Sequence, residues 1–465
     1  MSDPCGNSPR RSGHPDPRPV MSFLVNYTVV KFFTESLWRD EAFSWAMATQ
    51  GLGILPLTAR DFNPPLYYLL LYSWMQIAGS SEAAMRSLSI VFFTGTLYVS
   101  WRFMIDLLGV PARRAALYLI LFAINPMLSY YAVEARMYSL LALLAAASYY
   151  AYLARRPALY VLSTTAALYT HYFMFLVIAC QVLGSVLTGG FTELRRRVVL
   201  LAAPLMLLAP WVLATMWLKE DYGSEFWVEP LAWKFAVHLV TSIYTGHDAV
   251  YGFLERPERW LFVLSLVPLV LWCLWTGYRW AERRTIVANT ALWALLPPVS
   301  IFILSFVKPV FVPRYLIFSA VGLLLLFVAG LERLQPIARA AALMVLGALA
   351  LQYQVLQAQR HSKGVFRETI AEISRQAGPD DLLYVARELE FFPAQYYFDR
   401  SRVFVFGPKY DDIKAYTGKV LIPRDKVVLA LPQTRQRVFV LNGDREVSVV
   451  QGGRWIPVTV GMGQD

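Results

Sequence analysis

Long apolar stretches recur along most of the chain, and short polar segments rich in arginine separate them. Two clear examples are LALLAAASYYAYLA at 141–154 and VGLLLLFVAGL at 321–331. A helix needs about 20 mostly apolar residues to cross a bilayer. Lipid offers no hydrogen-bond partners to an open backbone, so such segments fold as helices. The pattern therefore predicts an all-α polytopic membrane protein.

Eleven apolar stretches are predicted to span the membrane. The first is short and contains Lys31, and a first outer loop of residues 35–81 follows it. The apolar part of that loop, LYYLLLYSWMQIA, predicts a helix lying at the membrane interface. The predicted spans are 20–34, 82–105, 114–130, 137–154, 158–170, 171–188, 198–218, 260–276, 286–306, 312–330 and 340–357.

The composition agrees with this interpretation, because 57% of the residues are hydrophobic, 16% are charged and the mean hydropathy is +0.44. A soluble globular protein of this length carries more charge. The net charge of +11 lies mainly in short loops, for example at Arg113–Arg114, Arg155–Arg156 and Arg195–Arg197. This is the positive-inside pattern of membrane proteins. The charge therefore indicates orientation, and we expect no nucleic-acid partner.

The orientation predicts three regions in a multi-pass protein of the inner (plasma) membrane. Residues 1–19 are polar and proline-rich, and we expect a disordered cytoplasmic tail. Residues 20–358 form the transmembrane domain. Because the number of spans is odd, residues 359–465 are expected on the extracytoplasmic side. Cys5, Cys180 and Cys273 show no spacing typical of a disulfide framework or a metal site.

The composition changes after residue 359, where the chain becomes typical of a small soluble α/β domain. FRETIAEISRQ predicts an amphipathic helix, and a Gly-Pro-Asp-Asp turn follows it. The segments VFVFG, KVVLAL and RVFVLNG predict short strands. The fold class is therefore a helical membrane bundle with a small extracytoplasmic α/β domain.

Asp40 and Glu41 follow Arg39 at the start of the first outer loop. A carboxylate in a partly dry cavity can act as a base that takes the proton of an acceptor hydroxyl. The alternative is a solvated loop carboxylate beside Arg39, and both interpretations apply to Asp40 and to Glu41. The two acids could also share a divalent cation through their oxygens, although the sequence requires no metal and identifies no cofactor.

Further polar residues lie on the same predicted outer side, where ionisable groups near the membrane are often functional. Arg136 and Arg314 are candidates for binding a phosphate, and Lys308 is a weaker one. The alternatives are an interfacial arginine near a helix start and a side chain that reaches the lipid headgroups. The remaining pocket candidates are Glu134, Tyr138, His171, Asn63 and Tyr315.

Two of these candidates have clear structural alternatives. His171 lies between aromatic residues, and it could be a hydrogen-bonded core residue. Asn63 begins the segment Asn-Pro-Pro-Leu-Tyr-Tyr, and proline is well tolerated in a first helical turn. This segment is either a plain helix entry or a rigid loop that shapes the acceptor groove.

Five segments in order resemble the polytopic GT-C glycosyltransferases, over residues 36–330. The likeness is greatest to the bacterial RgtA/B/C/D-like group, which is related to protein O-mannosyltransferases and aminoarabinose–lipid A transferases. The segments are LWRDEAFS, NPPLYYLLLYSW, EARMYSLLALL, LYTHYFMFLVIA and VPRYLIFSAVGLLLL. The short first span with Lys31 departs from the longer apolar run that is usual in this family.

The resemblance implies an inverting enzyme that takes a sugar from a polyprenyl-phosphate donor on the extracytoplasmic side. Asp40 matches the family's base or acceptor-orienting carboxylate, and Glu41 completes that motif. Glu134 matches a second acid that shapes the site. Arg136 and Arg314, with Lys308 and His171 after them, match basic residues that bind the lipid phosphate. The implied acceptor is an envelope lipid, glycan or protein.

Two other classes stay open at this stage. A transporter or flippase of lipid-linked sugars often has inverted repeats and broken midplane helices, and the sequence shows neither. A non-catalytic membrane scaffold is the other alternative. The sequence names neither the sugar nor the acceptor, because specificity depends on the shape of a site rather than on the fold.

Overall fold

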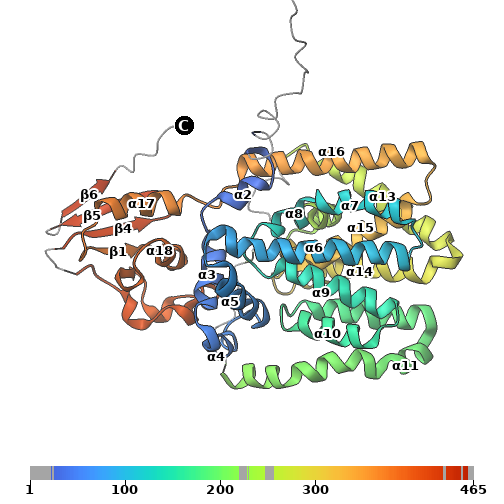
Figure 1. Cartoon of the computed structure of the whole chain (residues 1–465), viewed down its shortest axis with the longest axis horizontal. Helices are drawn as coiled ribbons and strands as arrows, with labels where there is room; N and C mark the ends of the chain where they lie inside the picture. The colour runs from blue at the N-terminus through green and yellow to red at the C-terminus, as the bar shows by residue number, and fades with distance from the viewer. Residues whose placement is uncertain are drawn as a thin grey trace, which may run out of the picture.

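The computed structural model describes residues 22, 26–218, 228, 230–246, 256–432, 436–451 and 454–458. An elongated bundle of roughly parallel helices forms one part, and a mixed α/β unit lies at one end of it (Figure 1). Short helices from the predicted first outer loop, residues 35–81, lie between the two parts (Figure 1). The predicted tail, residues 1–19, and most of residues 219–230 lie outside the described residues.

The bundle is built around α15, in which every residue from Ile317 to Leu331 is buried. Such a uniformly apolar helix is stable only at the centre of a bundle, and α9, α13 and α14 pack against it. The bundle helices are α6 (Glu82–Asp106), α7 (Ala112–Ala123), α8 (Pro126–Ala132), α9 (Tyr138–Leu153), α10 (Pro157–Leu168), α11 (Met174–Leu218), α13 (Arg259–Arg279), α14 (Arg284–Leu304), α15 (Ile317–Leu331) and α16 (Pro336–Arg360).

The predicted apolar stretches fold as helices, but the number of long spans is lower than eleven. By length and composition, six helices among the described residues can cross a membrane, or seven if α7 and α8 form one span bent by 74°. The predicted spans 137–154 and 158–170 are the shorter helices α9 and α10. The spans 171–188 and 198–218 are two parts of α11, which breaks at Gly190 (φ +65°).

The predicted first span differs most from expectation. Its described part contains the helix α2 (Val30–Thr34) of five residues, and residues 20, 21 and 23–25 lie outside the described part. The Lys31 ammonium donates to the carbonyl oxygen of Ala358 at 2.6 Å. Lys31, which interrupts the apolar pattern of the predicted first span, therefore attaches α2 to the end of α16.

The first outer loop forms a compact set of short helices: α3 (Arg39–Ala48), η1 (Gly51–Gly53), α4 (Ile54–Thr58) and α5 (Leu66–Ala78). Helix α5 begins after Pro64–Pro65 and confirms that this segment is helical, while its position at the membrane interface stays a prediction. Helix α3 packs against α5 and against the mixed α/β unit that follows residue 359 (the C-terminal unit). The remaining short helices of this half are η2 (Trp233–His238), α12 (Leu239–Thr245), η5 (Ala281–Arg283) and η6 (Pro313–Leu316).

The C-terminal unit contains a six-stranded sheet in the order β3-β2-β1-β4-β5-β6. Strands β1 to β4 pair in parallel, whereas β4, β5 and β6 pair antiparallel. The strands are β1 (Leu382–Val385), β2 (Val403–Phe406), β3 (Val427–Val428), β4 (Val438–Asn442), β5 (Glu446–Gln451) and β6 (Arg454–Val458). The three strands predicted from sequence correspond to β2, β3 and β4.

Helices α17 (Phe366–Gln376) and α18 (Phe391–Tyr397) pack against each other beside this sheet. Phe366, Ile370 and Ile373 are buried at helical spacing, which confirms the predicted amphipathic helix. Short 3₁₀ turns connect the strands: η7 (Glu388–Glu390), η8 (Arg400–Arg402), η9 (Tyr410–Asp412), η10 (Ala415–Thr417), η11 (Lys419–Leu421) and η12 (Arg424–Lys426).

Gly330 lies at a close contact between α15 and α13. A Cβ at this position would collide with Cys273 Sγ and would lie 3.2 Å from Cys273 Cα. We expect Gly330→Ala to reduce the free energy of unfolding by about 1–3 kcal/mol, as overpacking does. The loss should appear as a lower melting temperature of the protein in detergent.

Gly347→Ala in α16 is the matched control, because its nearest neighbour would be Ile124 Cδ1 at 3.8 Å. Alanine also favours a helix more than glycine does, so this variant should keep or raise the melting temperature. Equal melting temperatures for the two variants would contradict the close packing of α13 and α15.

Candidate active site

Asp40 and Glu41 lie in the first turn of α3, where negative charge is favourable because of the helix dipole. Successive residues of a helix with 3.6 residues per turn point about 100° apart. The two adjacent carboxylates therefore reach different surroundings. Asp40 lines a cavity beside the C-terminal unit, while Glu41 is fully buried on the other side.

The cavity next to Asp40 has a volume of about 530 Å³ and mixes charged, polar and aromatic side chains. It forms where α3, the turn before α5, the turns before α9 and α11, and η6 meet the C-terminal unit. Its lining residues are Trp38, Arg39, Asp40, Phe43, Asp61, Phe62, Asn63, Arg136, His171, Tyr172, Phe173, Arg314, Tyr315, Leu389, Phe392, Tyr416, Thr417 and Gly418.

Arg136 brings a positive charge into this cavity from a buried position, since only 7% of the residue is exposed. Its Nη1 donates to the carbonyl oxygen of Asp40 and to Ser44 Oγ, both at 3.3 Å. No carboxylate oxygen of the described residues lies within 4.0 Å of its guanidinium. A buried charge is costly unless an opposite charge neutralises it, so this guanidinium is suited to an anionic ligand.

Arg314 and Tyr315 enter the cavity from η6, and His171 enters from the turn before α11. The ring of Tyr315 lies 5.1 Å from that of His171 between centroids. His171 Nδ1 accepts a hydrogen bond from the backbone N–H of Phe173 at 3.1 Å. Burial and the nearby charge of Arg136 lower the pKa of His171 to about 3. The imidazole is therefore neutral and contributes no cation to the site.

The C-terminal unit closes one side of the cavity with residues 389, 392 and 416–418. Gly418 has φ +87°, and a Cβ there would lie 2.7 Å from Phe43 Cδ2 and 2.8 Å from Phe392 Cε2. Glycine alone combines this backbone conformation with so little space. Phe43 and Phe392 also contact each other, with ring centroids 5.3 Å apart. The shape of the cavity therefore depends on close packing between α3 and the C-terminal unit.

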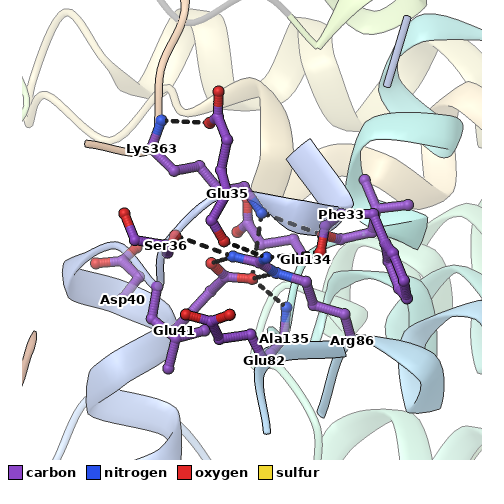
Figure 2. A network of polar contacts seen from close by, with 12 residues as sticks. Phe33, Glu35, Ser36, Asp40, Glu41, Glu82, Arg86, Glu134, Ala135 and Lys363 are labelled. Atoms are coloured by element: carbon purple, nitrogen blue, oxygen red, sulfur yellow. Dashed lines mark hydrogen bonds and ion pairs between the residues drawn. The ribbon is translucent and has the colours of Figure 1, made fainter. Parts of the chain in front are cut away.

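Glu41 is the centre of a buried network of ion pairs (Figure 2). Arg86 Nε and Nη2 donate to its two oxygens at 2.8 and 2.6 Å. The backbone N–H of Ala135 and the ammonium of Lys363 donate to Oε1 at 2.9 and 3.2 Å. Burial alone would raise the pKa of Glu41, but the charges of Lys363 and Arg86 hold it at about 2. Glu41 is thus an ionised anchor that does not line the cavity.

Arg86 also fixes the segment that precedes α3. Its Nη1 donates to the carbonyl oxygens of Phe33 and Glu35 at 2.9 and 2.6 Å, and its Nη2 donates to that of Ser36 at 3.1 Å (Figure 2). Sequence analysis did not single out Arg86 or Lys363. An arginine inside a predicted membrane span often has a functional or structural role. The position of Arg86 in the predicted span 82–105 could therefore have identified it.

Glu134 lies near this network rather than in the cavity, and its side chain is fully buried. Neither carboxyl oxygen has a hydrogen-bond partner among the described residues. Burial and the charge of Glu41 raise the pKa of Glu134 to about 7, although Lys363 acts in the opposite direction. Tyr138 and Lys308 are also absent from the cavity lining, whereas Asn63 and Tyr315 are part of it.

The geometry gives no support to a cation shared by Asp40 and Glu41. Both oxygens of Glu41 already accept hydrogen bonds from cationic side chains. Across the described part of the chain, no group of three or more His, Cys, Asp and Glu side chains could hold a metal ion.

Sequence analysis also missed Asp61, a second carboxylate that lines the cavity.

The arrangement of the membrane helices and the C-terminal unit is the polytopic GT-C fold. ArnT from Cupriavidus metallidurans in the apo state has a similar structure, with a TM-score of 0.61, 15% identity, and 91% of each chain covered. The same protein bound to undecaprenyl phosphate gives a TM-score of 0.58 at 15% identity, covering 90% of this chain and 92% of that one.

The archaeal oligosaccharyltransferase AglB from Archaeoglobus fulgidus is also similar, with a TM-score of 0.51 and 12% identity. The alignment covers 90% of this chain and 68% of AglB, which was solved with an inhibitory peptide and a dolichol-phosphate. No protein-family model and no curated protein matches the chain. At these identities the structural comparisons establish the fold.

Arg86→Met should strongly destabilise the protein. It would leave the buried charge of Glu41 without its closest partner, a change that costs about 3–5 kcal/mol in comparable buried pairs. Thermal unfolding in detergent would measure the loss. Arg102→Met is the matched control on the same helix, since Arg102 pairs with Asp106 at 2.8 Å but is 37% exposed. Similar melting temperatures for both variants would contradict the anchoring role of the buried network.

Glu134→Gln should change how stability depends on pH. The carboxyl has a pKa of about 7 in the folded protein and about 4.3 when unfolded. Between these values the folded state binds more protons, so wild-type stability falls as pH rises through this window. The melting temperature of the wild type relative to Glu134→Gln should therefore decrease from pH 4.5 to about pH 7. Parallel curves for the two proteins would refute a neutral Glu134.

Proposed function

We propose that the protein is an inverting glycosyltransferase that moves a sugar from a polyprenyl-phosphate donor to an acceptor hydroxyl. The observation that carries this proposal is the meeting of Asp40 with two arginines, Arg136 and Arg314, in one cavity. A carboxylate can accept a proton, and guanidinium groups bind phosphate oxygens. The similar structures of ArnT and AglB contain bound undecaprenyl phosphate and a dolichol-phosphate, respectively, which supports a lipid-phosphate donor.

The chemistry follows from these positions. Asp40 accepts the proton of the acceptor hydroxyl, or orients that hydroxyl, as its oxygen attacks the anomeric carbon of the sugar. The bond between the anomeric carbon and the phosphate oxygen breaks on the opposite face. Arg136 and Arg314 stabilise the negative charge that develops on the leaving phosphate. The products are the glycosylated acceptor and the polyprenyl phosphate.

The structure refines the roles that we propose for the other candidates. Glu41 holds α3 in place, so we assign it positioning rather than contact with the substrate. Tyr315, His171 and Asn63 shape the cavity, while Lys308 lies outside its lining and is not needed to explain phosphate binding. The cavity lies at the end of the bundle that adjoins the C-terminal unit, which favours a surface reaction over transport. We place this end on the extracytoplasmic side of the inner membrane.

Asp40→Asn tests the reaction in proteoliposomes supplied with radiolabelled undecaprenyl-phosphate glucose, mannose or arabinose. Turnover of the preferred donor should fall at least about 100-fold, the usual lower bound for losing a general base. Asp411→Asn, at an exposed position in the C-terminal unit, should leave turnover unchanged. Binding of undecaprenyl phosphate should weaken in Arg136→Ala and persist in Asp40→Asn.

Two outcomes would overturn the proposal. Equal turnover by wild type and Asp40→Asn would remove Asp40 from the reaction. Failure of the folded wild type to bind undecaprenyl phosphate, with Arg136→Ala no different, would remove the phosphate site and favour a scaffold.

A further inference from the structure

Asp61 lies in the turn between α4 and α5 and lines the same cavity as Asp40. Asp61 is buried, with a relative exposure of only 7% for the whole residue. The amide of Asn63 donates to Asp61 Oδ2 over a long distance of 3.5 Å, and the backbone N–H groups of Phe62 and Asn63 also act on the carboxylate. These local contacts shape the turn that holds Asp61.

In the described part of the chain, Asp61 shares its cavity with cationic side chains but forms no close ion pair with them. Three arginines line the cavity, at positions 39, 136 and 314. Nevertheless, no Lys, Arg or His nitrogen of the described residues lies within 4.0 Å of the Asp61 carboxylate. A buried carboxylate is costly when it lacks strong donors. Among the described residues, Asp61 therefore makes no ion pair, although the charge of Arg136 acts on its carboxylate. A ligand can supply the further hydrogen bonds that this carboxylate is able to accept.

Other residues that line this cavity indicate which chemical class of ligand it suits. Phe62, Tyr172 and Phe173 line the cavity together with the amide of Asn63. A sugar ring presents C–H faces that pack on aromatic rings, and its hydroxyls donate to carboxylates and amides. Sites that recognise small molecules commonly combine apolar walls with a few fixed polar groups in this way.

We propose that Asp61 and Asn63 form the subsite for the transferred sugar, with the Asp61 carboxylate accepting hydrogen bonds from its hydroxyl groups. The inference rests on the proposed function, in which Arg136 and Arg314 bind the phosphate of the same donor. The cavity is then divided between a phosphate end and a sugar end. Asp61 is a specificity-determining residue, because a site built to bind a hydroxyl strongly rejects analogues that lack it.

The test separates recognition of the sugar from recognition of the lipid phosphate. Competition binding to the full chain in detergent would compare undecaprenyl phosphate with undecaprenyl-phosphate glucose, mannose and arabinose. The proteins are wild type, Asp61→Asn and Arg136→Ala. Asparagine keeps the size and the turn-forming oxygen of Asp61 and removes the charge. Glu390→Gln is a matched control, because Glu390 is a fully buried carboxylate outside the cavity lining.

Asp61→Asn should weaken binding of the preferred sugar-bearing lipid at least tenfold and change binding of undecaprenyl phosphate less than twofold. Arg136→Ala should weaken binding of both lipids, and Glu390→Gln should weaken neither. Equal losses for the two lipids in Asp61→Asn would show that Asp61 only supports the turn, and no loss would show that it contacts no ligand. Either result overturns the sugar subsite while the phosphate site stands.

One further result would overturn this inference. The wild type would bind undecaprenyl phosphate, but it would bind each of the three sugar-bearing lipids no more strongly than Asp61→Asn does. By contrast, a wild type that binds no lipid at all refutes the proposed function itself. Melting temperatures of each variant would identify any that fail to fold, and Asp61→Ser would then replace Asp61→Asn.

Discussion

The ion-pair network of Arg86, Glu41 and Lys363 is the interaction on which the rest of the site depends. Its three charges are fully buried, so each must be neutralised within the protein. Arg86 belongs to α6, Glu41 to α3 and Lys363 to the connection between α16 and α17. One network therefore sets the relative positions of three regions that are far apart in the sequence.

Two adjacent carboxylates have separate roles because helix geometry turns them apart. Glu41 points into the network and fixes α3, and the same rotation directs Asp40 to the cavity. Arg86 and Lys363 pair with Glu41 and do not line the cavity. The cations that line the cavity are Arg39 at the start of α3, Arg136 in the turn before α9 and Arg314 in η6.

Periodicity and composition were enough to predict the bundle, the C-terminal unit and the helix 366–376, because these depend on local patterns. Asp40, Arg136 and Arg314 were also selected as candidate site residues from their place at the ends of apolar stretches, and all three line one cavity. Sequence analysis could not assign different roles to Asp40 and Glu41, since that difference depends on what packs around α3. Asp61 and Lys363 were missed for a similar reason, because only the tertiary structure brings them to their partners.

The contact of Gly418 with Phe43 and Phe392 has a consequence for biogenesis. Helix α3 precedes the bundle helices α6 to α16 in the chain, whereas Gly418 follows all of them. A ribosome-bound chain that has inserted all its membrane helices still has a cavity open on one side. The wall is completed only when the end of the chain has folded against α3, so a prematurely terminated protein would retain its membrane bundle and lack a closed site.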